Sequence, residues 1–436
     1  MGPEVILYSF AILMLLVVLG VHIGIALGTA TVVGIWLAYG DVEIALSILG
    51  STSYEAIRSD ALAVIPLFVL MGEVLSRAGA ATDLYRICDR ALSFLPGRLA
   101  AATVLGNAGF AAVSGVSIAS AATFSRIAYP EMRKVGYDQS YSLGVVAGSA
   151  CLGMLIPPSV LLIIWAILTE GSVGALFIAG IVPGLLLALA FIGYNVVAAL
   201  RNPELAPKGE ETHQAEPLSM QSAAGGFGVI ALIVLVLGGI WQGFFTPTEA
   251  AGFGALGSLV IAAFKRMGRK TFLTAIIDAG KTAAPIMFLL IAGSMYARLL
   301  AVSGGTTMIN DFFVASGMTP LMLIIAMTLI WLLMGMLIDA ISIILLTVPI
   351  FVPLAAAAGV PELAFAIYGI LIIEAGLLTP PVGLLVYTVK AAVPDKSVSL
   401  SQIFRGSTPY WLLILLVGMA VLLVPETATW LPEKAF

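Results

Sequence analysis

One apolar stretch, residues 148 to 165, restricts the possible fold more than any other part of this sequence. It is close to the roughly 20 residues that a helix needs to cross a bilayer, but Gly153 and the pair Pro157-Pro158 interrupt it. Proline removes a backbone donor and clashes with the preceding helical turn, so this helix must break in its middle. Because non-helical backbone cannot face lipid, the break is predicted to be buried in protein or to line a water-filled cavity.

A near copy of this stretch occurs later in the chain. Gly376 again lies four residues before a proline pair, Pro380-Pro381, with apolar residues on both sides. An offset of 223 residues relates Gly153 to Gly376 and the first proline pair to the second. The same offset relates Pro130 to Pro353 and Gly136 to Gly359. We therefore interpret the chain as two related halves. Interrupted spans in matching places of two halves indicate the binding site of a secondary transporter.

Composition identifies the class of protein. Hydrophobic residues make up 61% of the chain and charged residues only 10%, whereas soluble domains carry about 25% charged residues. We expect an all-α polytopic membrane protein, and the 436 residues have room for roughly ten to twelve spans. The two cysteines, Cys88 and Cys151, lie in different segments and predict neither a disulfide nor a metal site. We expect a lipid bilayer around the chain and no nucleic-acid partner.

The first half, residues 1–200, is expected to contain scaffold helices followed by interrupted ones. Apolar runs predict spans at 5–20, 22–39 and 62–78, with an acidic loop before the third. Charged and apolar residues alternate with a helical period over 83–95, which predicts an amphipathic helix at the membrane interface. Residues 98–134 form two short apolar legs with a Ser-Gly tip, which predicts a re-entrant helical hairpin. The broken span at 138–170 and a helix at 173–200 follow.

A polar stretch at 201–222 is expected to be a cytoplasmic linker to the second half, residues 223–436. The second half repeats the plan of the first. Its expected elements are spans at 225–244 and 247–264, a basic cluster at 265–270 that opens an amphipathic stretch, a span at 284–303, a second hairpin at 320–358 with its tip near 335–342, a broken span at 361–393 and a last helix at 407–424. Each half then has an odd number of full spans, which predicts an inverted-topology repeat.

The basic residues predict the orientation of the chain. If the N-terminus is periplasmic, the lysines and arginines fall on the cytoplasmic side except Arg58, Arg298, Lys434 and Arg126, which lies within the first hairpin. Cytoplasmic loops of membrane proteins carry an excess of these residues. The sequence therefore favours a periplasmic N-terminus.

The sequence offers no residues for enzymatic catalysis or ATP hydrolysis. It contains no G-x-x-x-x-G-K-[ST], H-E-x-x-H or G-x-S-x-G motif. The two histidines are far apart: His22 lies where the first two helices meet, and His213 lies in the linker, so we expect interfacial or solvated roles. We expect a transporter without a cofactor rather than an enzyme.

The candidate binding groups are backbone carbonyls and hydroxyls at the breaks and hairpin tips. Unwound segments supply carbonyls that can coordinate Na⁺, and half-helix N-termini supply N–H groups for anions. The candidates for a first sodium site are Ser114, Gly115, Ser117, Gly153, Ile156 and Pro158. The candidates for a second site are Gly335, Asp339, Gly376, Thr379 and Val382. The alternative is that these glycines and prolines only kink helices for packing.

Ionisable residues at the expected membrane depth are further candidates. Arg126 either binds the substrate or snorkels toward the cytoplasmic surface. Glu374 is a proton or cation site, or else caps a helix or forms a pair. In contrast, residues 246–249 have a sufficient local explanation as a helix-capping box.

Seven motifs resemble the large membrane subunit of tripartite ATP-independent periplasmic (TRAP) transporters, and together they cover nearly the whole chain. They are Ser114-Gly-Val-Ser117, the stretch 129–137, Ile156-Pro-Pro-Ser159, the stretch 179–184, Thr246-Pro-Thr-Glu-Ala-Ala251, Met334-Gly-Met-Leu-Ile-Asp339 and Gly376-Leu-Leu-Thr-Pro-Pro-Val-Gly383. The resemblance implies an elevator-type, Na⁺-driven importer of organic acids in the bacterial inner membrane. It also implies two partners, a small membrane subunit and a periplasmic substrate-binding protein.

The resemblance implies sodium ligands at family positions that match Ser114, Gly153, Ile156, Pro158, Gly335, Gly376, Thr379 and Val382. One departure is Val116, where many members carry a second serine. If that position contributes only its carbonyl, nothing is lost; if a hydroxyl is needed, the first site is weaker or Ser117 replaces it.

We expect the two hairpins and the two broken spans to form a moving transport domain, with the other helices as its scaffold. The alternative function is a Na⁺-coupled organic-anion symporter of related architecture that needs no binding protein. A membrane-embedded enzyme or a structural scaffold is disfavoured, because the sequence has neither a nucleophile–base pair nor a metal cluster.

Overall fold

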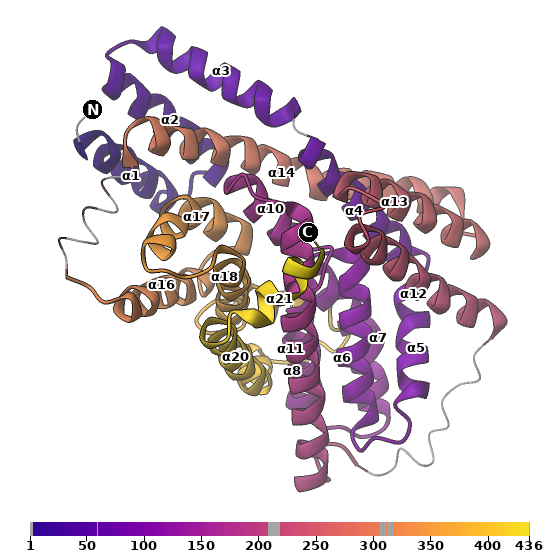
Figure 1. The fold of residues 1–436 in the computed structure, drawn as a ribbon. Helices are drawn as coiled ribbons and strands as arrows, with labels where there is room; N and C mark the ends of the chain where they lie inside the picture. Colours follow the sequence, from indigo (N-terminus) through magenta and orange to yellow (C-terminus); the bar gives the residue numbers. More distant parts are fainter. Residues whose placement is uncertain are drawn as a thin grey trace.

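The computed structural model describes residues 3–58, 60–207, 219–305, 308, 311, 315 and 317–435, and this part of the chain is helical without strands (Figure 1). The helices of the first half are α1 (Pro3–Val18), α2 (Ile23–Tyr39), α3 (Val42–Arg58), α4 (Asp60–Arg77), α5 (Ala80–Ala91), α6 (Arg98–Ser114), α7 (Ser117–Lys134), α8 (Gln139–Ala150), α9 (Leu152–Leu155), α10 (Val160–Leu168) and α11 (Val173–Arg201). Half of the predicted linker, including His213, lies outside the described residues.

The second half is helical as well. Its helices are α12 (Met220–Trp241), α13 (Pro247–Phe264), α14 (Arg269–Val302), α16 (Pro320–Gly335), α17 (Ala340–Ala357), α18 (Glu362–Gly376), α19 (Leu384–Ala392), α20 (Leu400–Leu423) and α21 (Glu426–Ala435). The predicted hairpins form two helix pairs, α6–α7 and α16–α17, and the predicted breaks separate α9 from α10 and α18 from α19. Membrane re-entry by these pairs and the inverted relation of the halves stay predictions.

Seven helices in the described part of the chain are long and apolar enough to cross a membrane, or eight if the bent pair α3–α4 forms one span. This number is smaller than the ten to twelve spans that the chain length allows. The difference arises partly because the apolar helices α1, α2 and α16 are at most 17 residues long. Many exposed side chains on the long helices are apolar; Leu189, Val234, Val260 and Leu416 are 64% to 69% exposed. Such exposure suits lipid rather than water.

Two sequence predictions are wrong in this part of the chain. The acidic loop expected after α2 is the helix α3, which exposes most of its side chains and buries Ala45. The amphipathic stretch and the separate span expected from residue 265 onward are one helix, α14, with Pro285 inside it. α14 packs against α2, α3 and α4, so tertiary contacts support the helix on both sides of the proline.

The amphipathic helix α5 forms about where it was predicted. It ends at Ala91 rather than Leu95, and it packs against α6 and α12. Asp83, at the start of α5, is buried and forms an ion pair with Lys265. The short C-terminal helix α21, which packs against α11 and α18, was not predicted from the sequence.

An aromatic cluster joins the two halves in the core. The ring of Trp165 on α10 lies 6.2 Å from that of Trp331 on α16 and 5.9 Å from that of Phe365 on α18. Gly369 makes this packing possible, because a Cβ there would lie 2.8 Å from Trp331 and 2.9 Å from Trp165. α10, α17 and α18 contact one another and lie together near the middle of Figure 1. The broken helix of the first half is thus anchored on the second half.

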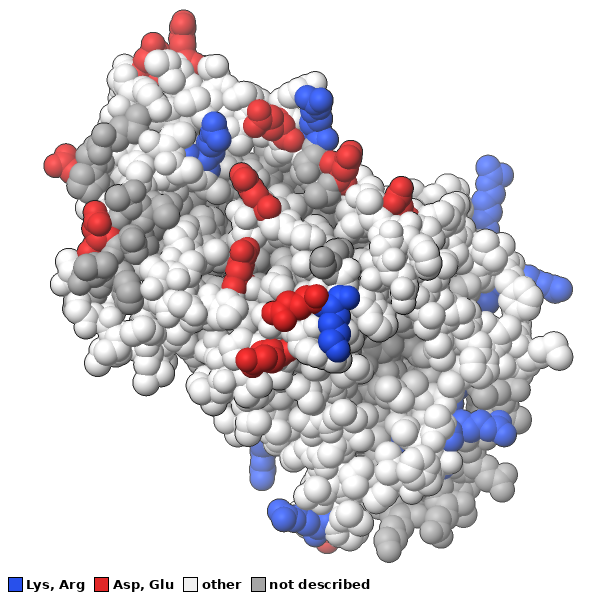
Figure 2. Space-filling view, in the orientation of Figure 1, with Lys and Arg blue, Asp and Glu red and all other residues white. Residues whose placement is uncertain are grey.

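The surface view in Figure 2 shows wide areas that carry neither acidic nor basic side chains. Acidic residues gather on the upper left of this face, and lysines and arginines predominate at the lower right. A broad uncharged surface is what the hydrocarbon core of a bilayer requires of the side chains that face it.

The predicted orientation can be tested at position 268. Gly268 is exposed in the turn between α13 and α14, beside the basic cluster. Gly268→Cys should react with an impermeant thiol reagent only in opened or inverted vesicles, whereas Gln242→Cys, in the exposed turn between α12 and α13, should react in intact cells. The native Cys88 and Cys151 are buried and should give little background. Labelling of Gly268→Cys in intact cells would overturn the orientation.

Candidate functional site

The first hairpin tip contacts the first break through its backbone. α6 ends at Ser114 and is capped by Gly115, which has a φ of 64°, and α7 begins at Ser117. The N–H of Val160 donates to the carbonyl of Gly115 at 3.1 Å. A Cβ on Gly115 would lie 2.6 Å from the carbonyl oxygen of Pro158, so only glycine allows the tip to approach the break this closely.

Other first-site candidates lie in the same contact. A Cβ on Gly153 would be 3.0 Å from both the nitrogen and the Cα of Ser117. The hydroxyl of Ser114 is buried and lies 3.5 Å from that of Ser120. Ile156 has extended backbone between α9 and the proline pair, and its N–H donates to Leu152. The structure therefore brings the first hairpin tip and the first break together.

The second tip and the second break meet in a similar way. The N–H groups of Val382 and Gly383 both donate to the carbonyl of Met336 at 3.3 Å. A Cβ on Gly335 would lie 2.7 Å from the Cα of Gly376. The hydroxyl of Thr379 donates to the carbonyl of Gly376 at 2.7 Å. Since a hydroxyl has two acceptor lone pairs, this bond leaves the oxygen of Thr379 able to bind a cation.

Asp339 has a local role that the sequence interpretation did not include. Its side chain caps α17, accepting from the N–H of Ser342 at 3.0 Å and from the hydroxyl of the same residue. Both carboxylate oxygens are therefore used within the tip. Helix capping explains Asp339 without a bound ion.

A contact between the halves connects the two break regions. The hydroxyl of Ser117, at the first tip, donates to a carboxylate oxygen of Glu374 at 3.2 Å. The thiol of Cys151 contacts the backbone carbonyl of Glu374 at 3.8 Å. Cys151 and Glu374 occupy equivalent positions under the offset of 223 residues, a relation that the sequence analysis did not use. A carboxylate from the second half thus reaches the first hairpin tip.

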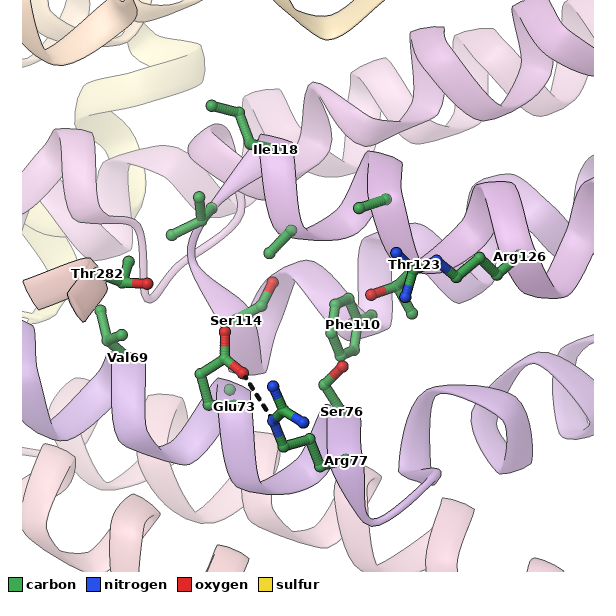
Figure 3. Close-up of a pocket in the computed structure, with 14 residues that line it drawn as sticks. Val69, Glu73, Ser76, Arg77, Phe110, Ser114, Ile118, Thr123, Arg126 and Thr282 are labelled. Atoms are coloured by element: carbon green, nitrogen blue, oxygen red, sulfur yellow. Dashed lines mark ion pairs between the residues drawn. The ribbon is translucent and has the colours of Figure 1, made fainter. Parts of the chain in front are cut away.

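A cavity of about 510 Å³ lies beside the first tip, between α4 and the hairpin (Figure 3). The polar residues that line it are Glu73, Ser76, Arg77, Ser114, Thr123, Arg126 and Thr282. Arg126 is exposed in this cavity on α7. The geometry allows the guanidinium of Arg126 to meet an anion in the cavity.

Sequence reasoning missed Arg77, which faces the same cavity from α4. Its guanidinium lies 3.6 Å from the carboxylate of Glu73 and also pairs with Asp278 on α14. Glu73 and Arg77 are four residues apart on one helix, a spacing that indicates an ion pair but not a cavity. Their exposure to the cavity depends on how α4 packs against the hairpin.

The donor set suits a hard monovalent cation. Among the described residues, no cluster of histidine, cysteine and carboxylate side chains is able to hold a transition metal. The two tip and break contacts instead bring together backbone carbonyls and hydroxyls, the oxygen ligands that unwound helices offer to Na⁺. Arg126 lines the same cavity as Ser114 of the first tip, and its guanidinium carries a positive charge that would attract an anion.

Comparisons with known proteins agree with this architecture. The family model "Tripartite ATP-independent periplasmic transporter, DctM component" matches residues 10–427. The C4-dicarboxylate TRAP transporter large permease protein DctM of Pseudomonas aeruginosa is 33% identical over 384 residues, which are 87% of this chain and 88% of that protein. The sialic acid TRAP transporter large permease protein SiaM of Vibrio cholerae is 28% identical over 375 residues, 85% of this chain and 86% of that protein.

Two solved transporter structures share the fold. The YdaH transporter of Alcanivorax borkumensis superposes with a TM-score of 0.62 at 13% identity, over 92% of this chain and 90% of that one. MtrF of Neisseria gonorrhoeae gives a TM-score of 0.63 at 16% identity, over 91% and 85% of the two chains. At such low identities the likeness concerns the fold alone.

Proposed function

Because the chain belongs to the family of the DctM component of tripartite ATP-independent periplasmic transporters, we propose that it is the large permease of a Na⁺-driven importer of an organic acid. Its partners are a small membrane subunit and a periplasmic binding protein that delivers the substrate. Relatives are named for C4-dicarboxylate and sialic acid, both carboxylates, which supports an acidic substrate here. The permease lies in the bacterial inner membrane with a periplasmic N-terminus.

The observation that carries this proposal is the backbone contact between each hairpin tip and a broken helix. These contacts leave carbonyl and hydroxyl oxygens close together at each junction, as coupling-ion sites require. The first sodium site uses Ser114, Gly115, Ser117, Gly153, Ile156 and Pro158. The second uses Gly335, Gly376, Thr379 and Val382, with Asp339 at its edge. The sodium gradient supplies the driving force for import.

The cavity at the first tip is the proposed substrate site. It lies between the hairpin, which belongs to the moving unit, and α4 and α14, which belong to the scaffold. A carboxylate that pairs with Arg126 would travel with the hairpin in an elevator movement. Each hairpin moves with its broken helix because tip and break are joined through the backbone, and the two pairs move together because Ser117 bonds to Glu374 and Trp165 packs against Trp331.

Reconstitution tests the function. In liposomes with an inward sodium gradient, we expect uptake of a labelled organic acid only when the chain, the small subunit and the cognate binding protein are all present. Uptake without the binding protein would instead support the alternative, a Na⁺-coupled symporter that works without such a protein. Absence of uptake with every partner and a panel of C4-dicarboxylates and sialic acid would contradict both.

Thr379→Val tests the second sodium site. The variant removes a hydroxyl ligand, while the carbonyl of Gly376 keeps its bond from the N–H of residue 379. We expect the sodium concentration for half-maximal uptake to rise at least about tenfold, because a bond to a charged group contributes roughly 1.5 to 3 kcal/mol. Thr31→Val is the matched control: Thr31 is buried on α2 and donates to Leu27 at 2.8 Å. An unchanged sodium dependence would exclude Thr379 as a side-chain ligand.

Arg126→Lys tests the substrate site. The compact ammonium cannot reproduce a bidentate guanidinium–carboxylate pair. We expect the substrate concentration for half-maximal uptake to rise by roughly tenfold or more, with the sodium dependence kept. Arg201→Lys, at the exposed end of α11, is the control. If Arg126 only anchors the hairpin at the membrane surface, lysine snorkels equally well and transport stays normal at matched expression.

A further inference from the structure

Glu374 is a buried carboxylate without a charge partner among the described residues. It lies in the last turn of α18, directly before the second break, and is 1% exposed. One carboxylate oxygen accepts from the hydroxyl of Ser117 at 3.2 Å. The other, Oε2, is buried and has no hydrogen-bond partner in the described part of the chain.

One hydroxyl is too little for a buried carboxylate. An ionised carboxylate offers about four acceptor sites, and buried charges in proteins are usually paired or coordinate a metal ion. The groups that reach Glu374 from neighbouring segments are Ser117 on α7 and Cys151 between α8 and α9. Neither side chain is a cation. The N-terminus of α7 contributes only about half a positive charge, so the negative charge of an ionised Glu374 stays unbalanced until a cation binds or the carboxyl is protonated.

We propose that Glu374 is an anionic ligand of the first sodium site, so that the Na⁺ at the first hairpin tip is coordinated by both halves of the chain. This inference rests on the proposed function. Ser117 is the shared member: it belongs to the first site and contacts Glu374 directly. The orphaned Oε2 then receives the partner that the rest of the described structure does not supply.

The inference makes the two sodium sites unequal. The position equivalent to Glu374 in the first half is Cys151, a free and buried thiol, so the repeat does not provide a matching carboxylate for the second site. The first site therefore takes a carboxylate ligand from the other half of the chain, whereas the carboxylate at the edge of the second site, Asp339, is used in capping α17. Occupancy of the first site would add a second link between α18 and the first hairpin to the hydrogen bond from Ser117 to Glu374.

Binding of Na⁺ to the purified full chain tests the proposal without transport. Thermal unfolding is measured at increasing NaCl, with choline chloride holding the ionic strength constant. A ligand that binds only the folded state raises the unfolding temperature, so the titration reports Na⁺ affinity. Glu374→Gln keeps the size of the side chain and an oxygen that accepts from Ser117, but it removes the charge. We expect the half-saturating Na⁺ concentration to rise at least about tenfold.

The control is Cys151→Ser, which alters the other group in contact with Glu374 without changing its charge, and should stay within about twofold of wild type. If Glu374→Gln binds Na⁺ like wild type, Glu374 only fastens the hairpin through its hydrogen bond, and this inference fails while sodium coupling stands. If Na⁺ does not stabilise even the wild-type chain relative to choline, the sodium coupling in the proposed function fails and this inference falls with it.

A second pair of variants decides the question if Glu374→Gln does not fold. Glu374→Asp and Glu374→Asn have the same size and differ in charge. Sodium must stabilise the Asp variant more than the Asn variant if the charge binds the ion. Equal stabilisation of the two overturns the proposal.

Discussion

The approach of each hairpin tip to a broken helix is the constraint on which the rest of the structure depends. At the first junction, glycine at positions 115 and 153 lets backbone meet backbone. At the second, Gly335 and Gly376 do the same. Any side chain at these positions would separate the segments and leave the freed N–H and carbonyl groups of the breaks without partners in an apolar interior. The breaks are tolerated because the tips cover them.

This constraint also explains why the proposed function uses backbone more than side chains. A membrane interior cannot hold many charged groups, so the oxygen ligands for a cation come from unwound helices and hydroxyls. The two charged residues near the first junction lie in different surroundings. Arg126 faces a cavity beside the first tip, and Glu374 lies buried between the halves. In the proposed function, different residues therefore bind the anion and the cation.

Packing between the halves holds the two hairpins and the two broken helices together. The aromatic cluster of Trp165, Trp331 and Phe365 ties α10 to α16 and α18, and the contact from Ser117 to Glu374 ties the first tip to α18. A hairpin that moved alone would expose these buried rings and leave polar groups unpaired, at a cost of several kcal/mol. Joint movement of both hairpins and both broken helices avoids that cost.

The sequence alone determined the membrane class, the breaks and the hairpin tips, because proline and glycine act on the backbone within one helical turn of their own position. Its acidic residues predict a loop where α3 forms, and its pattern divides α14 at a point where tertiary packing keeps the chain helical. Only the tertiary structure decided that Arg77 faces the cavity of Arg126 and that Glu374 reaches Ser117, 257 residues away. Such contacts depend on how whole helices pack, and no local rule of spacing or composition contains that information.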